Sequence, residues 1–178
     1  MPLYVCLQSS CRLAMTLADY TSREFIVPEL ACVDARGAIE QLARLLENAG
    51  RVASGAALVE AVLRREMLSS TAVAPGWALS HGRLASATEL CFGLGRSRQP
   101  IDWFGAVEPV RLIFLFAVPD GAAAAYLSVI SGLSRLSQDH DRAVKLLRAP
   151  EQDSILQELA QIELPSAPRR NRAVAAVS

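Results

Sequence analysis

A run of nine residues in the middle of the chain, Val110–Val118, is apolar except for Arg111. A strand that is apolar on both faces has to be covered on both faces, which is typical of a central strand in an α/β sheet. At nine residues the run is far too short for a membrane-spanning helix, which needs about 20. Pro119-Asp120-Gly121 follows it with turn residues. The run therefore predicts a sheet with helices on both sides.

Helical periodicity supplies the covering elements. Apolar residues recur at helical spacing through residues 35–49, where Asp34 can cap the start and Gly50 can end the helix. We expect further helices from Ser54 to about Arg65 and over residues 122–136, 141–147 and 153–162. We expect short strands at 25–28, 77–79 and 90–94, a polar loop at 95–100 and an extended segment at 101–103. This order predicts an α/β fold, a single domain with a mixed β-sheet covered by helices.

The length of the chain suits one domain with a substantial core. We assign this domain to residues 15–164. Residues 1–14 form an extension of unknown order, with Met15 as an alternative start. Residues 165–178 contain Arg169, Arg170 and Arg172 but no acidic residue, and we expect a disordered basic tail there.

Charge and composition exclude several classes of function. Basic and acidic residues number 18 each, and three of the basic ones lie in the tail, so the domain itself is slightly acidic. That argues against a nucleic-acid surface. Glycine-rich phosphate loops and G-x-S-x-G elbows do not occur. The cysteines show no metal-ligand spacing, so we expect no metal and no cofactor, and thiols in a reducing compartment (Cys6, Cys11, Cys32 and Cys91). We expect a soluble, cytoplasmic protein without membrane insertion.

Two histidines are candidates for chemistry. His140 lies between two aspartates in a polar linker, and we expect a solvated loop residue. His81 stands where a short apolar strand is predicted to stop. Gly82, directly after it, permits close approach of a partner backbone, and the small residues at 69–74 leave the ring accessible. From these residues alone, both a functional His81 and a structural histidine with satisfied hydrogen bonds remain open.

Two adjacent arginines end the second predicted helix. Arg65 follows Leu58 by seven residues and falls on the same inward face, whereas Arg64 follows Glu60 by four and can pair with it at the surface. A guanidinium on an apolar face needs either a carboxylate partner or an anion. Both alternatives for Arg65 stay open at this point.

The motifs around these residues resemble a known family. Arg65-Glu66-x-x-x-x-Thr71 followed by Ala78-Leu79-Ser80-His81-Gly82-Arg83 is similar to the signature of type 2 IIA domains of the bacterial phosphoenolpyruvate-dependent sugar phosphotransferase system, the fructose, mannitol and nitrogen-regulatory class. The likeness covers about residues 16–163 and continues through Gln99-Pro100-Ile101-Asp102-Trp103, Pro109-Val110-Arg111-Leu112-Ile113-Phe114, Val118-Pro119 and Leu147-Arg148-Ala149.

The resemblance implies a mixed sheet between helices and a protein that carries a phosphoryl group. His81 matches the phosphorylated histidine and Arg65 the arginine beside it, while Ser80, Thr71 and the backbone near Gly82 are weaker candidates for holding phosphate. The donor would be a histidine phosphocarrier protein. A nitrogen-type member would then regulate a target protein. The alternatives are a sugar-specific component that passes phosphate to a IIB cysteine, and a degenerate binding module without transfer. Whether the protein is an enzyme depends on this transfer.

Three departures from the family pattern affect these expectations. Ser80 stands in place of the usual proline, which leaves the acceptor histidine intact. Pro75-Gly76-Trp77 is expected to bring a large ring near the site. Many relatives have a second histidine where this chain reads Ala124-Ala125-Tyr126, so Tyr126 either donates a hydrogen bond in its place or belongs to the core. The missing imidazole favours a regulatory member over one with efficient onward transfer.

Overall fold

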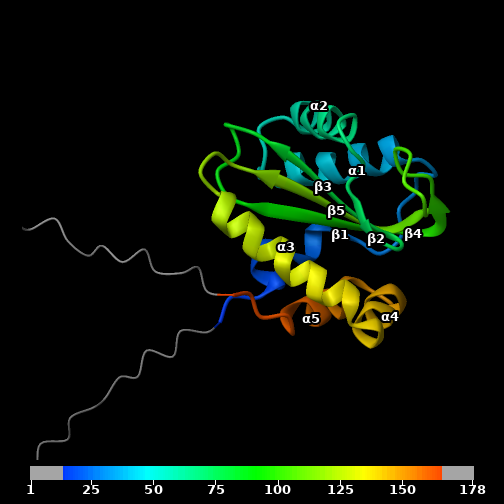
Figure 1. Ribbon diagram of the computed structural model, residues 1–178. Helices are drawn as coiled ribbons and strands as arrows, with labels where there is room; N and C mark the ends of the chain where they lie inside the picture. The colour runs from blue at the N-terminus through cyan, green and yellow to red at the C-terminus, as the bar shows by residue number, and fades with distance from the viewer. Residues whose placement is uncertain (1–13, 166–178) are drawn as a thin grey trace, which may run out of the picture.

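The computed structural model describes residues 14–165, which form one five-stranded mixed sheet with helices on both sides (Figure 1). The strands lie in the order β1-β4-β5-β3-β2. Strand β5 pairs in parallel with β3 and antiparallel with β4. The strands are β1 (Ile26–Val27), β2 (Ala72–Ala74), β3 (Trp77–Arg83), β4 (Cys91–Ile101) and β5 (Val110–Val118). The mixed α/β fold expected from the sequence is confirmed.

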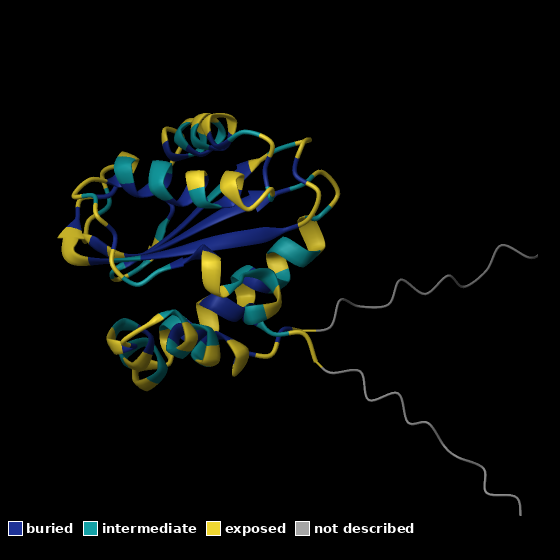
Figure 2. Cartoon of the chain, turned by 180° about the vertical axis from the view of Figure 1, so that it is seen from behind, coloured by how far each residue is buried: buried dark blue, intermediate teal, exposed yellow. Residues whose placement is uncertain are grey.

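Strand β5 is the central strand, as its apolar run predicts. Its side chains are buried except for Arg111, and they contribute to separate apolar clusters on the two faces. Seen from behind, the sheet is buried between helices whose outer surfaces are exposed (Figure 2). Phe114 and Phe116 pack toward one face, and Ile113 and Leu115 toward the other. The alternation of a strand thus builds two cores from one sequence run.

Five helices form the two covering layers. Helices α1 (Ala35–Asn48) and α2 (Gly55–Glu66) pack on one face, and α3 (Ala123–Gln138), α4 (His140–Arg148) and α5 (Gln152–Ala160) on the other (Figure 1). Two short 3₁₀ helices, η1 (Leu17–Tyr20) and η2 (Arg23–Phe25), precede β1. Asp34 and Ser54 cap α1 and α2 by accepting backbone N–H bonds from Gly37 and Ala57. Gly50 has the positive φ of 68° that suits the end of α1.

Three sequence-based expectations about element boundaries are wrong. Strand β3 continues past His81 to Arg83, because its parallel pairing with β5 runs on to Val118. The polar residues 95–100 form the second half of β4 rather than a loop. His140 opens α4, capped by the Asp139 side chain at 3.1 Å from the Arg142 N–H, although it is exposed as expected.

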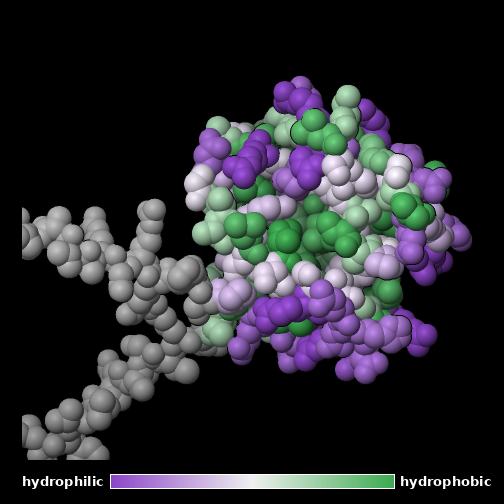
Figure 3. Space-filling view, in the orientation of Figure 1, coloured by the Kyte–Doolittle hydropathy of each residue, from purple (hydrophilic) through white to green (hydrophobic). Residues whose placement is uncertain are grey.

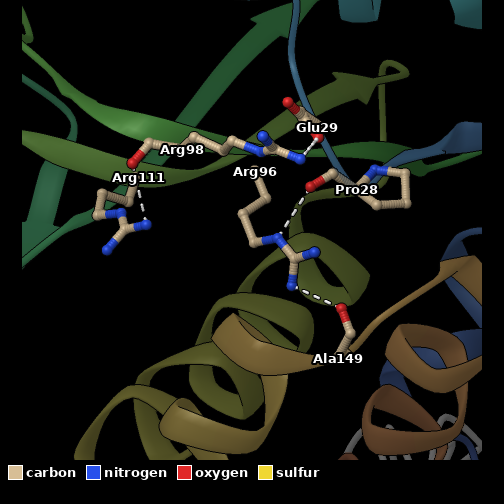
Figure 4. A network of polar contacts seen from close by, with 6 residues as sticks. All are labelled: Pro28, Glu29, Arg96, Arg98, Arg111 and Ala149. Carbon is tan, nitrogen blue, oxygen red and sulfur yellow. Dashed lines mark hydrogen bonds and ion pairs between the residues drawn. The ribbon is translucent and has the colours of Figure 1, made fainter.

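The polar half of β4 is held by backbone contacts instead of apolar packing. The Arg96 guanidinium donates to the carbonyl oxygens of Pro28 and Ala149 at 2.8 Å (Figure 4). It also donates to those of Leu147 at 2.7 Å and Leu146 at 3.3 Å. These carbonyls include the unpaired ones at the end of α4. Arg96 therefore joins β4 to both the β1 edge and the α3–α5 layer.

The two ends of the described range, near residues 14 and 165, lie side by side. The Leu164 N–H donates to the Met15 carbonyl at 2.7 Å. The expected extension at 1–14 and the expected basic tail at 165–178 fall almost entirely outside the described residues. Within residues 14–165, no helix has the length and apolar character needed to cross a membrane.

Candidate functional site

The alternation of β3 separates two neighbouring residues, Ser80 and His81. Ala78 and Gly82 face α1 and α2, and Ser80 shares their side of the strand. Leu79 belongs to the cluster on the α3 side, and His81 contacts α3. Pairing with β2 involves Trp77 and Ala78 and is followed by a Leu79 N–H bond to the Thr71 carbonyl. Beyond that point β3 pairs with β5 on one side only among the described residues, which leaves His81 at a sheet edge.

The His81 ring is half-buried against Tyr126 near the start of α3. Their ring centroids are 5.2 Å apart, and the Tyr126 ring also packs edge-on against Phe116 at 5.6 Å. Burial raises the pKa of Tyr126 to about 12, so its hydroxyl keeps its proton at neutral pH. The structure thus brings together two residues 45 positions apart that the sequence analysis singled out separately.

The environment of His81 favours a neutral ring. Burial lowers the pKa of His81 below its ordinary value of 6.5. The Arg65 and Arg83 cations lower the pKa further, while the Leu79 carbonyl and the Glu66 carboxylate oppose the change. Nδ1 lies 3.5 Å from the Leu79 carbonyl oxygen, and a carbonyl only accepts. The proton therefore belongs on Nδ1, which leaves the lone pair of Nε2 available as a nucleophile.

Two arginines supply positive charge near this ring. Arg65, at the end of α2, is half-buried, and its charge acts on both His81 and Tyr126. Its Nη1 donates to the Ser69 carbonyl at 2.8 Å, and no carboxylate of residues 14–165 pairs with it. Arg64 is exposed and pairs with Glu60 at 3.4 Å, as expected. Of the two alternatives for Arg65, the carboxylate partner is not observed, which leaves N–H donors for an anion.

Arg83, two residues beyond His81 on β3, is a charge that the sequence analysis did not single out. Its side chain is exposed, and its charge lowers the pKa of His81 together with that of Arg65. The period-two spacing from His81 was a usable signal, because residues i and i+2 of a strand lie on one face.

A buried carboxylate lies on the other side of the strand. Glu66 is 3% exposed and accepts hydrogen bonds from the Thr71 N–H at 2.9 Å, the Ser80 hydroxyl at 2.5 Å, the Trp103 indole N–H at 3.4 Å and the Thr71 hydroxyl. Thr71 and Ser80 are therefore bonded to Glu66 and buried, at 3% and 0% exposed. This arrangement does not present their hydroxyls to a phosphoryl group on the His81 face.

The sequence analysis missed Glu66 as a site residue although a signal existed. Leu58, Val62 and Glu66 follow one another at a spacing of four, and the first two are fully buried. A carboxylate at the next position of a buried stripe has to be satisfied internally.

Two neighbours of the site have other roles than expected. Gly82 faces α2, and a Cβ there would lie 2.8 Å from the Leu58 side chain. Its small size accommodates the protein's own helix and not the backbone of a partner. Trp77 is 4% exposed and stacks on Phe114 at 5.3 Å in the core. It starts β3, about 13 Å from His81 at the usual rise per residue, so its ring is not at the site.

The surface around the site suits a protein partner. In the orientation of Figure 1, apolar surface gathers across the middle of the molecule, between hydrophilic residues over α2 and over α4 and α5 (Figure 3). Next to Arg65, Met67 and Leu68 are 84% and 82% exposed, and Leu127, next to Tyr126, is 65% exposed. Exposed apolar side chains of this kind are typical of interaction surfaces. Among residues 14–165, no group of acidic, cysteine and histidine side chains could hold a metal ion.

Comparisons with known proteins identify relatives over most of the chain. A nitrogen regulatory protein of Bradyrhizobium diazoefficiens is 35% identical over 149 residues, which covers 82% of this chain and 95% of that protein. The fructose-specific EIIA component of Haloferax volcanii is 31% identical over 148 residues, covering 82% and 96%. The crystal structure of the nitrogen regulatory protein IIA-Ntr from Neisseria meningitidis superposes with a TM-score of 0.74 at 27% identity, covering 80% and 98%.

A family model covers nearly the whole described domain. It matches residues 19–162 and is described as the EIIA 2 component of the phosphoenolpyruvate-dependent sugar phosphotransferase system. The resemblance noted in the sequence is thereby confirmed, and the chain belongs to the EIIA type 2 family of this phosphotransferase system.

Proposed function

We propose that the protein accepts a phosphoryl group on Nε2 of His81 from the phosphohistidine of a small phosphocarrier protein. The observation that carries this proposal is a half-buried His81 with a lowered pKa beside an arginine that pairs with no carboxylate among residues 14–165. Neutral imidazole is the nucleophile, and Arg65 is the cation beside it. The proposal places the protein in the cytoplasm, in keeping with the free thiols of Cys32 and Cys91.

The transfer moves one group between two nitrogens. The His81 Nε2 lone pair attacks phosphorus, the P–N bond of the donor breaks, and the donor nitrogen recovers its electron pair. The Nδ1 proton of His81 stays on the ring, toward the Leu79 carbonyl. Such a transfer depends on positioning and charge stabilisation, so the Arg65 guanidinium can supply bidentate N–H bonds to the phosphoryl oxygens without a metal. Arg83 adds positive charge on the same side.

We assign different roles to the weaker candidates. Tyr126 packs against the His81 ring, with the two ring planes tilted by 45°, and its hydroxyl is a candidate donor to a phosphoryl oxygen. Backbone N–H groups near Gly82 remain candidate donors. Thr71 and Ser80 act from the buried side of the strand through Glu66.

We infer a regulatory role, in which the phosphorylation state changes binding to a target protein. The similarity to two nitrogen regulatory proteins and the tyrosine in place of a second histidine support this role. The second candidate is a sugar-specific component that passes phosphate to a IIB cysteine, which the 31% identical fructose-specific relative favours.

Labelling tests the proposal directly. The protein is incubated with phosphoenolpyruvate, the first enzyme of the pathway and the histidine phosphocarrier, and intact mass spectrometry then detects an acid-labile phosphoryl adduct. We expect the adduct on the wild type and on His140→Ala, and none on His81→Ala. Equal labelling of the two variants would defeat the assignment. A folded wild type that takes no label would indicate the degenerate binding module.

A chase separates the two candidate functions. Labelled protein is mixed with a fructose-type IIB domain, and the phosphate on each partner is followed with time. Retention of the label on this chain is expected for a regulatory member, whereas rapid transfer to the IIB cysteine identifies a sugar-specific component.

A further inference from the structure

Glu66 lies next in sequence to Arg65, and its partner Ser80 lies next to His81. The hydrogen bond between Ser80 and the buried Glu66 carboxylate thus links the residue after Arg65 to the residue before His81. The elements it joins are the end of α2 and the middle of β3. A shift of either element would change the distance between the Arg65 guanidinium and the His81 ring.

The Glu66 carboxylate accepts four hydrogen bonds. Two N–H groups, from Thr71 and Trp103, can only donate. The Thr71 and Ser80 hydroxyls are 3.0 Å apart, and each has a single proton, which the carboxylate geometry directs to Oε1 of Glu66. Four donors converging on one side chain fit an ionised carboxylate and fix three chain segments around it.

We propose that Glu66, with Ser80, is a positioning residue for phosphoryl transfer, holding the helix end that carries Arg65 in register with the strand residue next to His81. This inference rests on the proposed function. Glu66 and Ser80 do not touch the reacting atoms, because Ser80 is fully buried and directed to the opposite face of β3.

A structural role alone is the competing explanation. Apolar side chains of similar volume can often replace a buried charge without loss of stability. The hydrogen bonds to Glu66 are therefore weak evidence that Glu66 stabilises the fold. They do restrict geometry, since each donor occupies a defined direction around the carboxylate. A positioning role predicts that loss of the Ser80 hydroxyl matters only while Arg65 is present.

The test is a double-mutant cycle on the labelling rate with the phosphorylated carrier. Ser80→Ala is expected to slow labelling about tenfold, since small misplacements of a catalytic pair are costly. In the Arg65→Ala background the same change is expected to have less than about a twofold effect. Ser97→Ala is the matched control, because Ser97 is also buried, at 3% exposed, but donates to the Gln99 carbonyl on β4. The control is expected to keep the wild-type rate. An equal factor for Ser80→Ala in both backgrounds would overturn the positioning role.

A second readout does not need phosphoryl transfer. Tyr126 on α3 packs against His81, and the charges of Arg65 and Glu66 on α2 and of Arg83 on β3 act on the ring. The Arg65 cation lowers the pKa of His81. If Ser80→Ala loosens Arg65, the NMR titration midpoint of His81 moves up toward its ordinary value, and Ser97→Ala leaves it in place. An unmoved midpoint in Ser80→Ala contradicts the inference. A wild type that takes no label while this shift occurs would remove the proposed function but not the positioning by Glu66.

Glu66→Gln provides a second variant for the cycle. The amide keeps one acceptor oxygen, but its NH₂ group opposes donors that cannot reverse, so it is expected to slow labelling at least as much as Ser80→Ala. If this variant does not fold, Ser80→Ala alone decides the outcome.

Discussion

Two arginines, Arg65 and Arg96, differ in how many backbone carbonyls bind their guanidinium groups. Neither pairs with a carboxylate of the described residues. The Arg96 guanidinium donates to four backbone carbonyls, which tie β1 and α4 to β4. Figure 4 shows the bonds to Pro28 and Ala149. Arg65 donates to one carbonyl, that of Ser69. A guanidinium has five N–H donors; carbonyls engage the three on Nε and Nη1 of Arg96, whereas a carbonyl engages one on Nη1 of Arg65.

The difference separates a structural cation from one prepared for a ligand. Donors engaged by backbone carbonyls stabilise the fold, whereas free donors next to a nucleophile can bind oxygens that arrive with a substrate. Burial and charge alone do not distinguish the two residues, since both are half-buried. The number of protein acceptors around each guanidinium does.

Substitution of Arg65 is expected to have the largest effect on the rate at which His81 is labelled. Arg65→Ala is expected to slow labelling of His81 by the phosphorylated carrier about 100-fold or more, because a charged donor to the transferring oxygens is lost. Its thermal stability should stay close to that of the wild type. Stopped-time labelling and a melting curve measure the two quantities. Arg64→Ala removes the neighbouring exposed arginine as a control, and an equal loss of rate in that variant would show a nonspecific charge effect.

Arg96→Ala is expected to affect stability instead of rate. Four carbonyls lose a charged donor, so the free energy of unfolding should fall by about 3 kcal/mol. Denaturant unfolding measures this change, with labelling at low temperature expected to stay within about twofold of the wild type. Arg98→Ala, which removes an exposed pair to Glu29, is the matched control and should cost less than about 1 kcal/mol. If Arg96→Ala lost labelling rate without losing stability, Arg96 would act in phosphoryl transfer instead of stabilising the fold.

The pH dependence of labelling is expected to follow the neutral form of His81. Because the pKa of His81 lies below 6.5, the neutral nucleophile predominates above that pH, and the rate should be flat there and fall as the pH is lowered through the pKa. Removing the Arg65 cation raises the pKa of His81, so the midpoint in Arg65→Ala should move to higher pH. A pH–rate profile and an NMR titration of His81 check the sign. A downward shift would show that Arg65 does not act on the ring.

Tyr126→Phe is expected to have the smallest effect. The phenylalanine ring preserves the contacts with His81 and Phe116, and only the hydroxyl is lost, so labelling should slow by less than about threefold. The measurement is the same labelling rate at neutral pH. A loss of tenfold or more would place the Tyr126 hydroxyl among the groups that bind the phosphoryl oxygens.

Much of the fold was predictable because its signals are local. The apolar run of β5 identified the central strand, and Asp34, Ser54 and Gly50 marked helix boundaries through capping chemistry. The second half of β4 was not predictable in this way. It is stabilised by long-range pairing and by carbonyls that Arg96 reaches across the fold, and its own polar residues carry no strand signal.

The candidate site also contains residues that were predictable from the sequence and residues that were not. His81 and Arg65 were found from spacing and from the family motif, and their predicted roles are the basis of the proposal. The positions of Trp77 and Gly82 were misjudged, since closeness in sequence does not show which face of β3 a residue occupies or what packs on it. Glu66 was missed because its meaning depends on donors that arrive from Thr71 and Trp103, the second of them 37 residues away.

The proposed function depends on which histidine nitrogen receives the phosphoryl group. Two-dimensional ¹H–¹⁵N NMR of the protein, recorded before and after phosphorylation by the carrier, identifies the modified ring nitrogen of each histidine. We expect phosphorus on Nε2 of His81, with the Nδ1 proton retained toward the Leu79 carbonyl. Phosphorus on His140, or a His81 ring that remains unmodified while the protein is labelled, would contradict it.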